Sequence, residues 1–100
     1  MPQFAVVVPH ALGREDAMGR LDQLIERIRA EHGQSLSDMQ GGWAAHVLNF
    51  SFRAMGMAVS GAMDVSDDQV SVQGHLPLAA AFFRGKIEQT IRSELRSVLG

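Results

Sequence analysis

Alternation of large apolar residues with small or polar ones, over three consecutive stretches, is the feature that most constrains the fold of this chain. The stretches run from Ala44 to Phe52, from Met57 to Val65 and from Gln69 to Leu76. A period of two is typical of a β-strand with one buried face. The large side chains at one parity predict that face: Leu48, Phe50, Phe52, Met57, Val59, Met63, Val65, Val70 and Val72.

The connections between these stretches are short and carry turn-forming residues. Gly56 stands in the first connection and Ser66-Asp67-Asp68 in the second. Loops of this length join antiparallel neighbours, so we expect a three-stranded meander between Trp43 and Leu76. The residues at the opposite parity are small or uncharged, with hardly a charge beyond Arg53 and Asp64. We call the face that they would form the mild face.

Two amphipathic helices are predicted on either side of the meander. One begins at about Gly13 or Arg14, and the other is clear from Lys86 onward. Gln3 to Val8 is a β-prone run ended by Pro9, and Gln34 to Gly42 has the composition of a polar connector with a turn near Ser37-Asp38. The apolar stripes are Ala17, Leu21, Leu24, Ile25 and Ile28 in the first helix, and Ile87, Ile91, Leu95 and Val98 or Leu99 in the second.

The order of elements is therefore β-α-β-β-β-α. Each helix has one apolar side, and the buried face of the meander is the surface that can cover both. We predict a two-layer α+β domain, with a mainly antiparallel four-stranded sheet and both helices packed on one face. We expect the 100 residues to form a single domain, 1–100. The sequence leaves open at which edge of the meander the first strand pairs.

Composition excludes several classes of function. The chain has no cysteine, so disulfides and thiolate metal sites are ruled out. A net charge of −2 gives no electrostatic footprint for nucleic acid. No apolar run reaches the length of a membrane span, and the first residues lack the pattern of a signal peptide. We therefore expect a cytoplasmic protein.

Four segments, in order and over nearly the whole chain, carry a family resemblance. They are P-H-A-L-G-R-E-D-A at residues 9–17, F-S-F-R-A-M-G-M-A-V-S-G at 50–61, V-S-V-Q-G-H-L-P at 70–77 and G-K-I-E-Q-T-I-R-S-E-L at 85–95. Together they resemble the polyhydroxyalkanoic acid system proteins. The resemblance implies a bacterial, cytoplasmic accessory protein linked with storage polyesters, and it transfers no catalytic residue.

A candidate contact surface lies on the mild face of the meander. Trp43, Val47, Ala58 and Ala62 share its parity and would form a shallow apolar patch there. Exposed apolar patches often mark partner sites. Two alternatives remain for Trp43: its side chain folds back under the Gln34–Gly42 connector, or a bulge near Gly41-Gly42 changes its side.

His10 and Arg53 are the polar candidates. His10 follows a strand and precedes a helix, where it either serves a binding site or only shapes the loop. The four histidines lack the spacing of a metal motif, so no metal site and no cofactor are predicted. No nucleophile elbow of the form G-x-S-x-G is present, and we assign no catalytic residue.

Three functions compete at this stage. The first is a non-enzymatic accessory protein that binds a polyhydroxyalkanoate granule or a granule-associated protein, as the resemblance implies. The second is a small-ligand-binding protein or small enzyme with a pocket between helices and sheet, for which His10 and Arg53 would be the polar groups. The third is a homo-oligomer that associates through the mild face. An enclosed cavity with convergent polar groups would favour the second.

Overall fold

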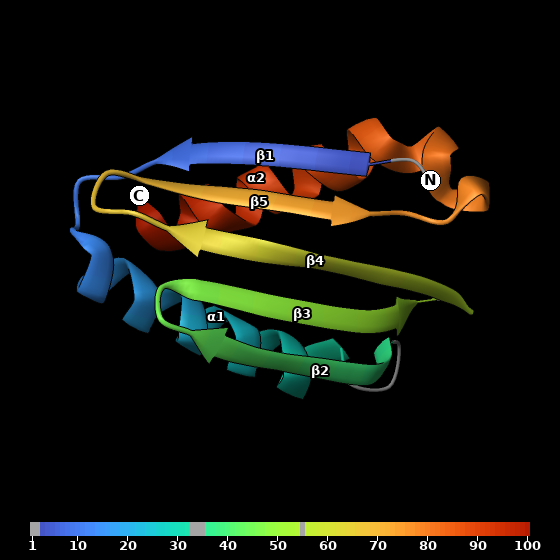
Figure 1. Ribbon diagram of the computed structural model, residues 1–100, viewed down its shortest axis with the longest axis horizontal. Helices are drawn as coiled ribbons and strands as arrows, with labels where there is room; N and C mark the ends of the chain where they lie inside the picture. Colours follow the sequence, from blue (N-terminus) through green and yellow to red (C-terminus); the bar gives the residue numbers. More distant parts are fainter. Residues whose placement is uncertain (1–2, 33–35, 55) are drawn as a thin grey trace.

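The computed structural model describes residues 3–32, 36–54 and 56–100, which form a sheet covered on one side by two helices (Figure 1). The order of elements confirms the predicted α+β class. The elements are β1 (Gln3–Pro9), α1 (Arg14–His32), β2 (Leu36–Ala44), β3 (Val47–Ala54), β4 (Met57–Val65), β5 (Gln69–His75), the 3-10 helix η1 (Leu78–Phe83) and α2 (Arg84–Leu99).

All neighbouring strands of the sheet are antiparallel, in the order β1-β5-β4-β3-β2. The predicted meander is confirmed as β3, β4 and β5. The first strand, whose position the sequence left open, pairs with β5, so that Val6 lies opposite Val72 and Phe4 opposite Gly74.

The sheet has five strands, so the prediction of four strands is wrong by one. The additional strand is β2, which occupies most of the segment predicted as a connector, including the predicted turn at Ser37-Asp38. It pairs with β3, with a register shift between Ser37 and Gln40. As an edge strand it needs only one partner, and edges tolerate the glycines and irregularities that hid it in the sequence. Residues 34 and 35 of the predicted connector lie outside the described residues.

A two-residue turn, Ala45-His46, joins β2 to β3. Ala45 has a φ of 55° and is the one non-glycine residue of the described chain with a positive φ. A positive φ at the first turn position matches the II′ hairpin turn, where glycine is usual because a Cβ is strained there. The tight turn therefore forms with a residue that gives no turn signal in the sequence.

We predict that Ala45→Gly raises the free energy of unfolding. Removing the Cβ relieves about 1–2 kcal/mol of backbone strain, and the greater freedom of glycine in the unfolded chain cancels roughly 0.5–1 kcal/mol of that gain. The expected net stabilisation is a few tenths to about 1 kcal/mol. Urea unfolding followed by circular dichroism measures it, and a clear loss of stability would contradict the strained turn.

Both helices pack on the same face of the sheet, as predicted (Figure 1). We call this the inner face. Each cross-strand pair has its side chains on one face, and the register brings the predicted large residues together, for example Leu48 beside Met63 and Met63 beside Val72. The buried core consists of Phe4, Val6, Val8, Ala17, Leu21, Leu24, Leu48, Met63, Val65, Val70, Val72, Leu76, Ala80, Leu95 and Leu99.

Two glycines lie opposite each other at the centre of the inner face. Gly61 of β4 pairs with Gly74 of β5. A Cβ on Gly74 would lie 2.5 Å from the ring of Phe4, and one on Gly61 would lie 2.9 Å from the ring of Phe50. The rings of the flanking strands thus occupy the space that side chains would need, which is a packing reason for both glycines.

Candidate functional site

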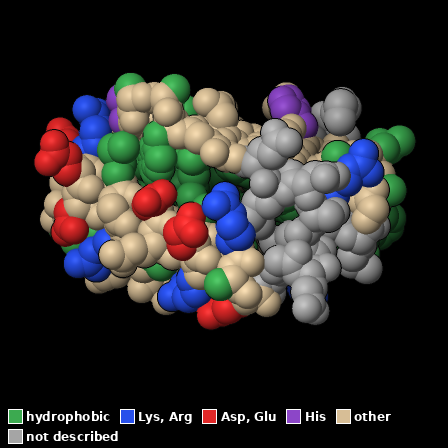
Figure 2. All heavy atoms as spheres, turned by 90° about the horizontal axis from the view of Figure 1, so that it is seen from below, with side chains coloured by type: hydrophobic (Ala, Val, Ile, Leu, Met, Phe, Trp, Pro, Cys, Tyr) green, Lys and Arg blue, Asp and Glu red, His purple; other side chains and the backbone are tan. Residues whose placement is uncertain are grey.

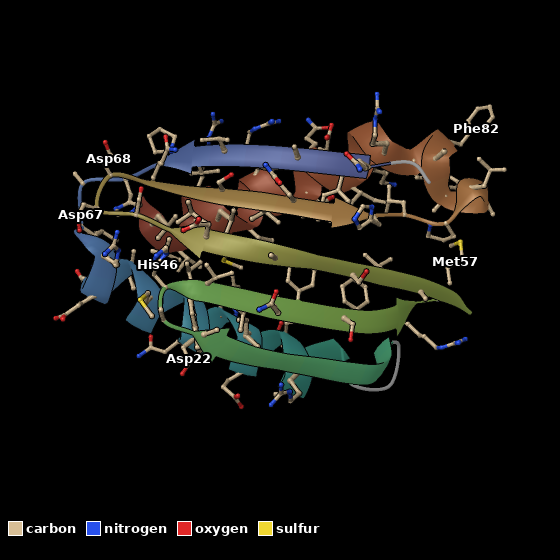
Figure 3. All side chains as sticks on the ribbon, viewed as in Figure 1. Asp22, His46, Met57, Asp67, Asp68 and Phe82 are labelled. Carbon is tan, nitrogen blue, oxygen red and sulfur yellow. The ribbon has the colours of Figure 1, made fainter. Side chains whose placement is uncertain are left out.

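The other face of the sheet carries no helix, and we call it the outer face. Its strand positions are mostly small or uncharged (Figure 3). Figure 2, seen from the β2 side, shows most of the charged side chains in the lower half, over the helix layer. The outward positions are Gln3, Ala5, Val7 and Pro9 on β1, Gly42 and Ala44 on β2, Val47, Asn49, Ser51 and Arg53 on β3, Ala58, Ser60, Ala62 and Asp64 on β4, and Gln69, Ser71, Gln73 and His75 on β5.

Four of the predicted binding residues lie on this outer face. In the β3–β4 ladder Val47 lies opposite Asp64, Arg53 opposite Ala58, and Ala62 opposite Asn49. The apolar members are separated by serines and amides and do not form one apolar patch. The structure therefore confirms the predicted face but gives it an uncharged polar character.

Trp43 lies on the inner face, so the prediction that it joins Val47 on the outer face is wrong. It pairs across the ladder with buried Leu48 and packs against the core. Its indole Nε1 donates to Asp22 Oδ1 of α1 at 3.4 Å. The Ala45-His46 turn separates it from β3, so the alternation of β3 cannot be extended back to it.

His10 is held by backbone atoms on both ring nitrogens. Leu12 N donates to Nδ1 at 3.1 Å, and Nε2 lies 3.1 Å from the carbonyl oxygen of Ser66. Because Nδ1 accepts, Nε2 carries the proton and donates to Ser66. The backbone N–H of His10 also donates to Asp68 O at 2.9 Å. His10 thus ties the β1–α1 loop to the β4–β5 turn.

We predict that His10→Ala lowers the free energy of unfolding by about 1–3 kcal/mol, because it leaves the Leu12 N–H and the Ser66 carbonyl without their partner. Chemical denaturation measures the loss. His75→Gln, a change at an exposed histidine of the outer face, is the matched control and should stay within ~0.5 kcal/mol of the wild type. An equally small change for His10→Ala would contradict the structural role.

A second histidine, His46, stands in the β2–β3 turn. Its Nδ1 lies 2.8 Å from Asp64 Oδ1, and both side chains are exposed. Asp64 is the one carboxylate on the described outward positions of the sheet. It binds His46 and not His75, so Ser60 and its cross-strand neighbour His75 are not joined to it in a Ser-His-acid chain.

Hollows on the surface are open rather than enclosed. One of about 870 Å³ is lined both by outer-face residues, such as Asn49, Ser60 and Gln73, and by residues of the inner face and α2. The latter are Phe4, Phe50, Gly61, Gly74, Arg84 and Glu88. Another, of about 660 Å³, lies where α1 and α2 meet and is lined mainly by polar side chains. No group of three metal-ligating side chains occurs in the part of the chain that the structure describes. Neither of these two hollows, in the described part of the chain, is an enclosed site between helices and sheet.

Among the described residues, the most exposed large apolar side chains are on η1, at the end of the molecule where β5 leaves the sheet. The exposed fractions are 81% for Leu78, 98% for Phe82 and 56% for Phe83. We call these three residues the apolar tip; Figure 3 shows Phe82 projecting away from the body. Phe82 and Phe83 are adjacent in the sequence, so at most one of them can easily join the apolar stripe of the second helix. Neither does, because η1 precedes the first turn of α2.

Comparison with known proteins gives one result. Residues 5–99 match the model of the family described as "Putative polyhydroxyalkanoic acid system protein". Neither the search of curated proteins nor the search of solved structures found a match. Among the described residues, neither helix is long and apolar enough to cross a membrane.

Proposed function

Because the chain belongs to the polyhydroxyalkanoic acid system protein family, we propose that it is an accessory protein of polyester storage which acts by binding, without catalysis of its own. Its apolar tip would hold it on the polyhydroxyalkanoate granule or on a protein of the granule surface. The observation that carries this proposal is the exposure of Leu78, Phe82 and Phe83 on a family member whose core is otherwise well covered.

The tip is anchored, so its exposure is a property of the fold. Leu76, just before η1, is fully buried, and Ala80 within it is 3% exposed. Ala80 N also donates to Pro77 O at 2.9 Å, which closes the first turn. Leu78, Phe82 and Phe83 are exposed beside these two buried residues. A segment whose backbone is already held by the core needs less ordering on binding than a free segment would.

Burial of such side chains gives enough free energy for surface association. Complete burial of a Leu or Phe side chain is worth about 1.5–3 kcal/mol, before the costs of association are deducted. Arg84 and Lys86 follow the tip and are exposed. Cationic side chains beside inserted apolar ones are typical of proteins that lie on an apolar–water interface. A polyester particle offers this kind of interface.

We predict that the wild type co-sediments with purified granules and that the double variant Leu78→Ser, Phe82→Ser binds about tenfold or more weakly, because two exposed apolar side chains are lost. The matched control is Val7→Ser, which removes a 51% exposed apolar side chain from the outer face. The control should sediment like the wild type. Equal sedimentation of all three proteins would contradict the role of the tip.

Two further measurements sharpen the result. Binding to protein-free polymer particles would identify the polyester itself as the partner, whereas binding only to native granules would identify a granule protein. A hydrolysis assay on soluble hydroxyacyl esters tests the second hypothesis from the sequence. Turnover that disappears in a folded variant altered on the outer face, such as His75→Gln, would overturn the binding proposal in favour of an enzyme.

A further inference from the structure

We propose that the surface which the apolar tip enters is a phospholipid layer of net negative charge. The apolar tip inserts among the acyl chains, and the side chains of Arg84 and Lys86 lie among the headgroups. This inference rests on the proposed function for the role of the tip as the contact segment, and it adds the chemistry of the partner. Three observations carry it: the state of the two cations, their place on α2 and the distribution of charge over the molecule.

Arg84 and Lys86 stand directly after η1, at the start of α2, and both are exposed. In the part of the chain that the structure describes, neither side chain forms an ion pair or a hydrogen bond. Glu88, one turn further along α2, accepts a hydrogen bond from Ala5 N of β1 at 2.9 Å. Asp38 belongs to β2, at the opposite edge of the sheet from β1, with which α2 packs. The two charges are therefore available to a partner outside the chain.

The position of these cations does not serve the helix that carries them. The N-terminus of a helix is the positive end of its dipole, so cations in the first turn are unfavourable and carboxylates are favourable. The other helix, α1, has Glu15 and Asp16 in its first turn, whereas α2 has no acidic residue there and no side-chain cap from Phe83. A departure from such a local rule without a gain inside the protein is typical of functional positions.

The charge of the whole molecule is polarised along β5. Its net charge is −2, and many of its carboxylates gather at the end opposite the tip, where the hydrogen bond from His10 N to Asp68 O joins the β1–α1 loop to the β4–β5 turn (Figure 3). Arg14 and Arg20 offset only two of them. The seven residues of β5 separate that turn from η1, which corresponds to roughly 20 Å. The carboxylates at that end are Glu15, Asp16, Asp64, Asp67 and Asp68.

This polarity selects the kind of surface that the tip can meet. A negative surface attracts the tip end and repels the opposite end, so it orients the molecule with Leu78, Phe82 and Phe83 toward it. An uncharged polyester surface can bury the apolar side chains but offers nothing to the cations. In a layer of anionic phospholipids, Arg and Lys keep their charged groups at the headgroups while their stems lie along apolar surface. Apolar burial and charge attraction then act together.

Co-sedimentation of the full chain with phospholipid vesicles tests the proposal. The probes are vesicles of phosphatidylcholine alone and vesicles of equal parts phosphatidylcholine and phosphatidylglycerol, at low salt. We expect the wild type to bind the anionic vesicles about tenfold or more tightly than the neutral ones, because two cations contribute. Added salt should reduce this preference, since it screens the charges. The variant Leu78→Ser, Phe82→Ser should lose binding to both kinds of vesicle.

Two double variants that remove the same charge from the same helix locate the effect. Arg84→Gln, Lys86→Gln should bind neutral vesicles like the wild type and lose the preference for anionic ones. It should also be as stable as the wild type in urea, because cations in a first turn do not support a helix. The matched control is Arg92→Gln, Arg96→Gln, whose positions lie ~12 and ~18 Å further along α2 than Arg84. That control should keep most of the preference, because a charge beyond about 10 Å is largely screened.

Equal binding of the wild type to both vesicles would overturn the proposal, and so would an equal loss of preference in the two double variants. Binding to lipid-free polymer particles without binding to vesicles would assign the tip to the polyester. Binding to native granules alone would assign the cations to an acidic protein of the granule surface. Both of these outcomes overturn the lipid partner and leave the proposed function intact. Granule binding that survives in Leu78→Ser, Phe82→Ser contradicts the proposed function itself, so the two failures are distinguishable.

Discussion

One-sided burial by the sheet is the constraint on which the rest of this structure depends. The large side chains of its strands lie on the inner face, where α1 and α2, together with Ala80 of η1, supply the apolar cover that they need. Both helices are thereby committed to one side. Close packing at the centre of that face even excludes side chains at Gly61 and Gly74, because the rings of Phe4 and Phe50 occupy the space. The outer face is left uncovered as a direct consequence.

This division of the molecule separates two surfaces of different chemistry. The outer face is broad and mostly uncharged, whereas the apolar tip on η1 is narrow and strongly apolar. The tip follows His75, so it lies at the Arg53 end of the sheet.

The sequence predicts most of the fold because alternation and helical stripes are strong signals where one side of an element is buried. It fails at β2, since an edge strand with Gly41, Gly42 and an irregular register resembles a loop. It also misplaces Trp43, because the turn at Ala45-His46 contains no glycine or asparagine to show that the alternation of β3 stops there. The uncharged outer face was predictable from parity alone. The exposure of Phe82 was not, since only the three-dimensional structure shows that η1 turns it away from the core.

Granule association is the central claim, and its most direct test is the position of the protein in living cells. Fluorescence microscopy of the tagged full-length chain can compare cells that accumulate polyester with otherwise identical cells that make none. The account predicts fluorescence on the granules in the first case and diffuse fluorescence in the second. Diffuse fluorescence in both, at the same expression level, would contradict it.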